Sequence, residues 1–444
     1  MSKKERKRKE QFHNNLEMSR RAFLGGTAGV MAASTVALTV PAKTAIAGPP
    51  TVITPHRHNP FGSASVRFVP TTEQNLGTSR IYGPIKRPSE LDTGFNRAHQ
   101  GHWGKDEGLK RTRFIAKHPL GAALSSTLML MSTDPAVGAF ADPAPNKLPI
   151  PDPERMSKHI KELAYFLRAD DVGIGDIRHE GTYTERFRAT PNNDGWFDFT
   201  SIVEDNSHHK YAIALLVDQD LRTFMGSTGY DGISGSQSFR SYLLTGYISV
   251  VMANYIRRLG YSARAHHARN YNQAVGPNLI SAGMGEMSRM QDSVLHPRLG
   301  FRHKAAVVTT DMPLKVDLPI DFGGSEFCRV CRKCAEHCPV NAVSTNKEQN
   351  QYNGYYRWCS DMEKCTLFRI GNEDGSSCGR CVKVCPWNSK GDSWFHSAGV
   401  QMVSRFPSLS PILRDIDDIF GYGTEEVKEF KWWLEWPELY KYNF

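Results

Sequence analysis

The 444-residue chain is long enough for two or three domains, and 40% hydrophobic with 10% aromatic residues is typical of a globular protein. Its formal charge of +9 is concentrated in residues 1–47, where nine Lys or Arg stand against three Asp or Glu. The rest of the chain carries only +3, which excludes the strongly positive surface expected of a nucleic-acid-binding protein.

Residues 1–47 have the order of a twin-arginine export signal. A basic stretch over residues 3–9 precedes Ser19-Arg20-Arg21-Ala-Phe-Leu, a weakly apolar run over 25–40 and an Ala45-Ile-Ala47 cleavage site. A membrane anchor is the alternative, but the run is short and rich in Gly, Ala, Ser and Thr. We therefore expect export of the folded protein.

In residues 48–150, Pro, Gly, Ser and charged residues are interleaved, which predicts an irregular wrapping region with a few short helices. Regular patterns begin near residue 151. Apolar residues at helical spacing predict a helix that ends near Asp170: Met156, Ile160, Leu163 and Leu167. Three strands are predicted, at 171–176, 211–217 and 305–310. A second helix is predicted over 247–259 with Gly260 as its C-terminal cap, and the alternation indicates an α+β domain over 151–315.

All nine cysteines lie between Cys328 and Cys385. The first run has the spacing C-x2-C-x2-C-x3-C-P, which binds [4Fe–4S] clusters in bacterial ferredoxins; it consists of Cys328, Cys331, Cys334, Cys338 and Pro339. The second run keeps the C-x2-C-x3-C-P ending at Cys378, Cys381 and Cys385, but about twelve residues separate it from its first cysteine, Cys365. This pattern indicates a loop inserted into the second binding motif.

Crossed ligation, the rule in two-cluster ferredoxins, assigns the cysteines to two clusters. The first set is Cys328, Cys331, Cys334 and Cys385, and the second is Cys338, Cys365, Cys378 and Cys381. Zinc does not need two C-x2-C-x3-C-P endings, and disulfides do not fit an odd number of cysteines confined to one segment. Cys359 lies outside both patterns; we interpret it as a packing thiol, with replacement of Cys365 as the alternative.

Other redox motifs are missing from the sequence. No Gly-x-Gly-x-x-Gly follows a strand, and the corrinoid-ligand motif Asp-x-His-x-x-Gly is absent. The histidine pairs at 208–209 and 266–267 are expected in solvated loops rather than at a metal. The aromatic segment 396–444 is interpreted as a packing arm. The residues alone therefore predict an exported two-cluster oxidoreductase whose redox domain is unidentified.

The chain also resembles the reductive dehalogenases, a family of corrinoid- and iron–sulfur-dependent enzymes. The matching features are the twin-arginine leader, segments 255–263, 270–273, 282–289, 300–302, 309–314 and 326–328, and both cluster motifs with the Cys385-Pro-Trp ending. The resemblance implies a nitroreductase-like corrinoid-binding domain over 151–315 and a ferredoxin-like two-[4Fe–4S] domain over 316–395. It also implies that a base-off corrinoid, reduced to Co(I) through the clusters, replaces a halogen of an organohalide with hydrogen.

In that family a tyrosine donates the proton and a basic neighbour stabilises its phenolate. The resemblance assigns these roles here to Tyr247 and Arg302, with Tyr242 and Lys304 as alternatives, and it implies that Asn272 contacts the substrate. Corrinoid contacts are expected at Gly283, Gly285, Arg289 and Thr310.

The resemblance further implies a small integral-membrane anchor subunit, a quinol-linked electron donor and a peripheral position on the outer face of the cytoplasmic membrane. A homodimer is left open, and a chlorinated hydrocarbon is the favoured substrate. Two alternatives are an epoxyqueuosine-reductase-like corrinoid enzyme and an exported dicluster electron-transfer subunit without corrinoid. The leader and the small mature charge count against the first, whereas cobalt analysis would distinguish the second.

Overall fold

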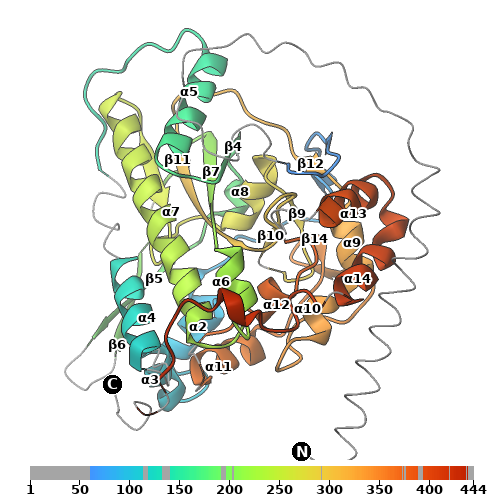
Figure 1. Cartoon of the computed structure of the whole chain (residues 1–444). Coiled ribbons are helices and arrows are strands. Elements are labelled where there is room, and N and C mark those ends of the chain that lie inside the picture. Colours follow the sequence, from blue (N-terminus) through green and yellow to red (C-terminus); the bar gives the residue numbers. More distant parts are fainter. Residues whose placement is uncertain are drawn as a thin grey trace, which may run out of the picture.

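The computed structural model describes residues 61–113, 119–132, 141–191, 197–202, 205–291, 293–372, 374, 377–388, 394–419, 421–436 and 438. The export signal predicted over 1–47 lies outside the described residues. The described part combines an antiparallel central sheet with helices on its faces, which confirms the predicted α+β class (Figure 1). No helix among the described residues is both long enough and apolar enough to span a membrane.

The central sheet has four antiparallel strands in the order β4-β7-β11-β8. Their bounds are Asp171–Asp176 for β4, Tyr211–Asp218 for β7, Ala263–His266 for β8 and His303–Thr310 for β11. The sequence predicts β4, β7 and β11, whose residues are mostly buried. It misses β8, which is short and carries the polar residues Arg264 and His266, although both are buried.

Helices α5 (Pro153–Phe166) and α7 (Gly232–Arg258) pack on one face of the sheet (Figure 1). The Asp152 side chain caps α5 by accepting a hydrogen bond from the Arg155 amide at 3.0 Å. The predicted stripe of α7 is confirmed, because Ile248 and Met252 are buried in this core. However, α7 begins at Gly232, well before the predicted start at residue 247.

Gly260 ends α7 as predicted, with a φ of +85° that favours glycine. A Cβ at this position would lie 2.2 Å from the carbonyl oxygen of Asn146, so the approach of the neighbouring chain also requires glycine. On the opposite face of the sheet, α8 (Val275–Ser281) packs against β7 and β11. The strands β9 (Glu286–Met287) and β10 (Val294–Leu295) form a hairpin near α8.

Over residues 61–113, where the description of the chain begins, the N-terminal region contains only short elements. They are β1 (Arg67–Phe68), β2 (Asn75–Leu76), β3 (Ser79–Arg80), η1 (Glu90–Asp92), α2 (Gly94–His99) and α3 (Lys105–Arg113). The longer α4 (Pro119–Met131) lies beside α7 (Figure 1). Further elements before α7 are η3 (His179–Gly181), β5 (Arg186–Pro191), β6 (Phe197–Ile202) and α6 (Leu221–Gly226).

The cysteine segment forms short helices and a hairpin. After β12 (Ile320–Asp321) come α9 (Gly324–Cys331), α10 (Lys333–Glu336), β13 (Asn350–Tyr352), β14 (Tyr355–Arg357), α11 (Met362–Gly371) and α12 (Arg380–Lys383). The C-terminal elements are α13 (Trp394–Arg405), η4 (Pro407–Leu409), α14 (Ser410–Ile419) and η5 (Lys428–Phe430). Val403 and Leu413 pack into the same core as Phe327 and Trp387. This packing agrees with the interpretation of the C-terminus as a packing arm.

Candidate functional site

Four cysteines from both ends of the cysteine segment converge on one cavity. They are Cys328, Cys331, Cys334 and Cys385, and they line the cavity together with Arg289, Phe301, Phe327, Arg332 and Pro386. Crossed ligation assigns the same four cysteines to one cluster. Short helices place the first three, whereas Cys385 follows α12 and returns to them from the second motif.

Burial raises the pKa of Cys328 to about 11 and that of Cys331 to about 12. Such thiols would not ionise alone at neutral pH, so iron would supply the positive charge that holds them as thiolates. Within the described residues, no three His, Cys, Asp or Glu side chains are close enough to hold a single metal ion. A cube of four irons holds its ligands farther apart, and the buried sulfur donors around one cavity fit it.

The structure also groups cysteines of the second set. Burial, with smaller contributions from the nearby Cys365 and Cys338, raises the pKa of Cys378 to about 11. Cys381 belongs to α12, directly after Cys378 in the motif. Cys359 is only partly buried. These contacts favour Cys365, rather than Cys359, as the fourth ligand of the second cluster.

A tyrosine and a lysine meet at the face of the sheet that α7 covers. Lys304, near the start of β11, places its Nζ 5.0 Å from the ring centroid of Tyr242 in α7. Tyr271 lies beside Tyr242; desolvation, then the nearby Tyr242 and Tyr183, raise its pKa well above the ordinary value. An ammonium group beside a phenol stabilises the phenolate, so this arrangement suits a proton-donating tyrosine.

Tyr247, the first candidate for the acid, lies elsewhere on α7. Its side chain is 55% exposed. Five helical residues correspond to about 500° of rotation, so Tyr247 and Tyr242 point in directions about 140° apart. The structure therefore brings the alternative pair, Tyr242 and Lys304, together. Sequence reasoning placed Tyr247 first, because the register of α7 against β11, which decides which tyrosine meets Lys304, is not visible in the sequence.

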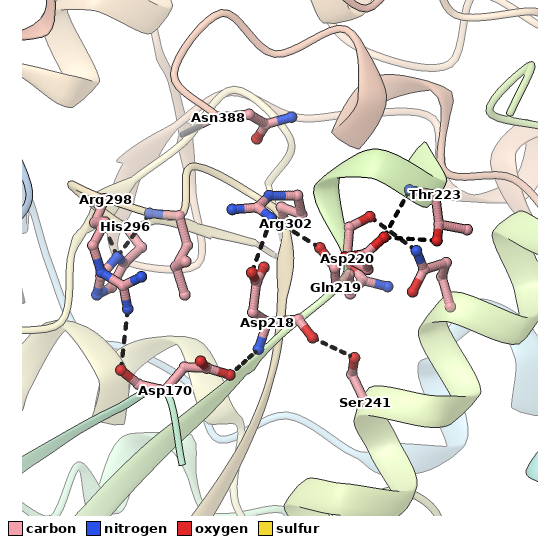
Figure 2. A network of polar contacts seen from close by, with 12 residues as sticks. Asp170, Asp218, Gln219, Asp220, Thr223, Ser241, His296, Arg298, Arg302 and Asn388 are labelled. Carbon is pink, nitrogen blue, oxygen red and sulfur yellow. Dashed lines mark hydrogen bonds and ion pairs between the residues drawn. The ribbon is translucent and has the colours of Figure 1, made fainter. Parts of the chain in front are cut away.

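Arg302, the first candidate for the cation, is engaged at the end of β7. Its Nη1 donates to Asp218 Oδ2 at 2.9 Å and to the Gln219 carbonyl at 3.1 Å (Figure 2). Burial raises the pKa of Asp218 to about 7 against the opposing effect of Arg302. Figure 2 also shows Asn388, which follows the predicted cluster ligand Cys385 in the sequence, on the other side of Arg302. Arg302 therefore lies between the sheet and the cysteine segment.

The remaining predicted contacts are spread over the molecule. Asn272 is buried next to Tyr271, and its backbone N–H donates to His266 Nδ1 at 3.1 Å. Thr310 is at the opposite end of β11 from Lys304, and its hydroxyl donates to the Ser262 carbonyl at 2.7 Å. A Cβ on Gly283 or Gly285 would lie within 2.4 Å of the carbonyl oxygens of Leu318 and Leu295, respectively, so protein backbone packs against both glycines. Their corrinoid contacts stay predictions.

The expectation that both histidine pairs lie in solvated loops is wrong. His209, His266 and His267 are buried, and only His208 is exposed. His209 Nδ1 and His266 Nε2 lie 2.8 and 2.9 Å from the Thr309 hydroxyl. Burial lowers the pKa of His209 to about 4, so it is neutral at physiological pH. The short strand β8 carries His266 into the sheet, and no sequence pattern indicated this strand.

A family model described as 4Fe-4S dicluster domain matches residues 327–389. This range contains every cysteine of both predicted sets. The fold and the site therefore define an iron–sulfur protein in which a dicluster domain follows an α+β domain.

Sequence comparison identifies the relatives of this protein. The chain is 32% identical over 310 residues to the tetrachloroethene reductive dehalogenase of Desulfitobacterium hafniense, a match that covers 61% of this chain and 54% of that protein. The corresponding enzyme of Sulfurospirillum multivorans is 34% identical over 180 residues, which is 39% of this chain and 35% of that protein. The chain spans about half the length of the Desulfitobacterium relative and about a third of the length of the Sulfurospirillum relative.

A solved reductive dehalogenase, whose structure suggests a mechanism for B12-dependent dehalogenation, is similar over 86% of this chain and 52% of its own, with a TM-score of 0.73 and 33% identity. A catabolic reductive dehalogenase in complex with 3-bromo-4-hydroxybenzoic acid gives a TM-score of 0.71 at 33% identity, over 86% and 53% of the two chains. These matches confirm the resemblance of the chain to the reductive dehalogenases.

Proposed function

We propose that this protein is a reductive dehalogenase that replaces a halogen of an organohalide with hydrogen. The observation that carries the proposal is the convergence of Cys328, Cys331, Cys334 and Cys385 on one cavity in a chain with this fold. The relatives named above act on tetrachloroethene or bind a brominated hydroxybenzoic acid. We therefore propose a small organohalide as the substrate, with a chlorinated hydrocarbon as the first class to test.

The α+β domain has features that fit a corrinoid. Among the described residues, several buried polar atoms near the ends of β7 and β11 lack a hydrogen-bond partner: Asp218 Oδ1, Gln219 Oε1, Arg302 Nε, His303 Nδ1 and Asn388 Oδ1. Buried polar atoms are costly without partners. The amides around a corrin ring both donate and accept, so they would satisfy this mixture. When bound, the corrinoid would supply the reduced cobalt that cleaves the carbon–halogen bond.

The protein supplies the proton. Replacing halogen with hydrogen consumes two electrons and one proton and releases a halide ion. In our proposal the Tyr242 hydroxyl donates this proton, and Lys304, 5.0 Å from the ring, stabilises the resulting phenolate. Tyr271 and the buried Asn272 would form an adjacent wall that excludes water and orients the substrate.

Metal content and turnover test the proposal together. The chain is produced anaerobically with corrinoid, and cobalt and iron are measured per polypeptide; two cubes and one corrin correspond to about eight irons and one cobalt. Halide release is then assayed with a reduced dye as electron donor. Loaded protein that releases halide from no organohalide would contradict the activity. Iron without cobalt would instead indicate an electron-transfer protein.

We also propose export by the twin-arginine route and a peripheral position on the outer face of the cytoplasmic membrane, supported by the motif in residues 1–47. A separate membrane anchor subunit and a quinol-linked donor would complete the electron supply. Replacement of Arg20 and Arg21 by Lys is expected to retain the protein in the cytoplasm. Unchanged export of this variant would refute the route.

A further inference from the structure

Arg289 lies at the first cysteine cavity rather than among the tyrosines. It follows β9, and its guanidinium is completely buried. Its Nε donates to the Cys328 carbonyl at 2.9 Å and its Nη2 to the Arg329 carbonyl at 3.1 Å. Its Nη1 donates to the carbonyls of Ser344 and Asn346 at 2.9 and 2.6 Å. One side chain thus joins α9 to the loop that follows Cys338.

An aromatic ring also stacks on the guanidinium and helps to hold its orientation. Its central carbon lies 4.7 Å from the ring centroid of Trp358, which is itself buried. Stacking of this kind holds an arginine in place and is strongest where water is excluded. Arg289 therefore cannot turn away from the cavity without losing the four hydrogen bonds and the stacking.

Arg289 differs from the basic residues around it in the groups that it contacts. Lys333 is paired with Asp417, and Arg329 with Glu326. By contrast, all four hydrogen-bond acceptors of Arg289 are neutral carbonyls. It shares its cavity with the four cysteines, three apolar residues and Arg332, which unlike Arg289 is exposed to solvent. An arginine stays protonated in proteins, so a full positive charge faces the site of the first cluster.

We propose that Arg289 is a positioning residue of the first cluster and that its buried charge raises the reduction potential of that cluster. This inference rests on the clusters of the proposed function. A [4Fe–4S] cluster held by four thiolates is negatively charged and becomes more negative when it takes an electron. A buried cation favours the more negative state, and the effect is large because little water screens it. Hydrogen bonding and charge near a cluster are established determinants of its potential.

The test uses the full chain with both clusters loaded. We would compare wild type, Arg289→Gln, which removes the charge, and Arg289→Lys, which keeps it but loses the forked geometry. Arg329→Gln is the matched control, because Arg329 also lies at α9 but is paired with Glu326 and partly exposed. Iron content is measured first, and the midpoint potential of each cluster is then obtained by redox titration followed by electron paramagnetic resonance.

We expect Arg289→Gln to lower the midpoint potential of one cluster and leave the other unchanged. Arg289→Lys should lie close to wild type, and Arg329→Gln should shift neither cluster. Full iron in Arg289→Gln with unchanged potentials would overturn the inference. If Arg289→Gln fails to bind one cluster, retention of iron by Arg289→Lys supports the role proposed for the charge. Loss of iron in both variants overturns the inference. Absence of both cluster signals from wild type would instead refute the proposed function.

Discussion

Lys333 offers a sharp test of how the C-terminal arm supports the cysteine segment. It lies between two cluster cysteines in the sequence, and its side chain is fully buried. Its Nζ is 2.5 Å from Asp417 Oδ2 and 2.7 Å from Asp418 Oδ1, and it donates to the Tyr422 carbonyl at 3.0 Å. The substitution Lys333→Met preserves much of the side-chain volume but removes the charge.

The expected loss of stability follows from how deeply the two aspartates that pair with Lys333 are buried. Asp417 has a side chain only 4% exposed, so the substitution removes the ammonium group beside a carboxylate in the interior. Removing one partner of a buried pair costs about 3–5 kcal/mol. Asp418 is 40% exposed and should contribute at most about 1 kcal/mol, because water screens it. We therefore expect a total loss of about 3–5 kcal/mol in the free energy of unfolding.

The assay is anaerobic denaturant unfolding of the cluster-loaded chain, followed by tryptophan fluorescence. In the double variant Lys333→Met with Asp417→Leu, no buried charge is stranded, so it should recover most of the lost stability. A loss below about 1 kcal/mol in the single variant would refute the reasoning, because it falls within the range of an exposed pair. A double variant less stable than the single variant would do the same.

The pH dependence gives an independent check. Burial acts to lower the pKa of Lys333, but Asp417 and Asp418 outweigh it, and the pKa is raised. A raised lysine pKa means that the stabilisation is fully present below the unfolded value of about 10.4 and is lost as the pH rises through the folded value. Wild type should therefore lose stability above about pH 10.4 more steeply than Lys333→Met.

Two further predictions concern the site. Tyr242→Phe should lower kcat by a factor of about 10²–10⁴, the usual contribution of a general acid, whereas Tyr247→Phe should leave kcat nearly unchanged; a larger loss in Tyr247→Phe would restore the first assignment. Cys365→Ser should remove the iron of the second cluster while Cys359→Ser keeps about eight irons per chain; the opposite result in iron analysis and electron paramagnetic resonance would make Cys359 the ligand.

The elements that were predicted correctly are those whose apolar residues form a pattern typical of a buried strand or helix. The strand β7 consists almost entirely of apolar residues and is buried along its length, and the stripe of α7 contains Ile248 and Met252. The first part of α7 was missed because Gly232–Ser241 is rich in Gly and Ser, which are weak helix formers. Its helical conformation depends on tertiary contacts such as the 2.7 Å hydrogen bond between the hydroxyls of Ser125 and Ser236.

In the site, too, features that depend on local sequence spacing were predicted, and features that depend on tertiary contacts were not. Cluster ligands are readable because a cube requires cysteines at fixed spacings, and the first predicted set does line one cavity. The pairing of Tyr242 with Lys304 depends on how a helix lies across a strand more than 60 residues away, which spacing does not encode. Arg289 was predicted as a corrinoid contact, whereas its side chain lies at the first cysteine cavity; the resemblance gave its segment of the chain but not the direction of the side chain.

The two cysteine motifs also share a feature that links them to the C-terminal arm. Lys333 and Arg380 each directly precede the third cysteine of their motif. Lys333 donates to the Tyr422 carbonyl at 3.0 Å, and Arg380 donates to the Thr424 carbonyl at 3.1 Å. Lys383, between Cys381 and Cys385, donates to the Glu425 carbonyl at 2.9 Å.

The segment 422–425 is thus held by basic side chains from both motifs. Because these bonds go to backbone carbonyls, they depend on the path of the chain rather than on the side chains of the arm, and substitutions at residues 422, 424 and 425 should be tolerated as long as that path is kept. Gly423 is different, because its φ is +74° and a Cβ there would lie 2.5 Å from the Lys383 carbonyl oxygen. Removal of the segment, in contrast, would leave Lys333 and Lys383 buried with fewer acceptors beside both clusters. The arm therefore supports the two cluster motifs together, in addition to packing against them.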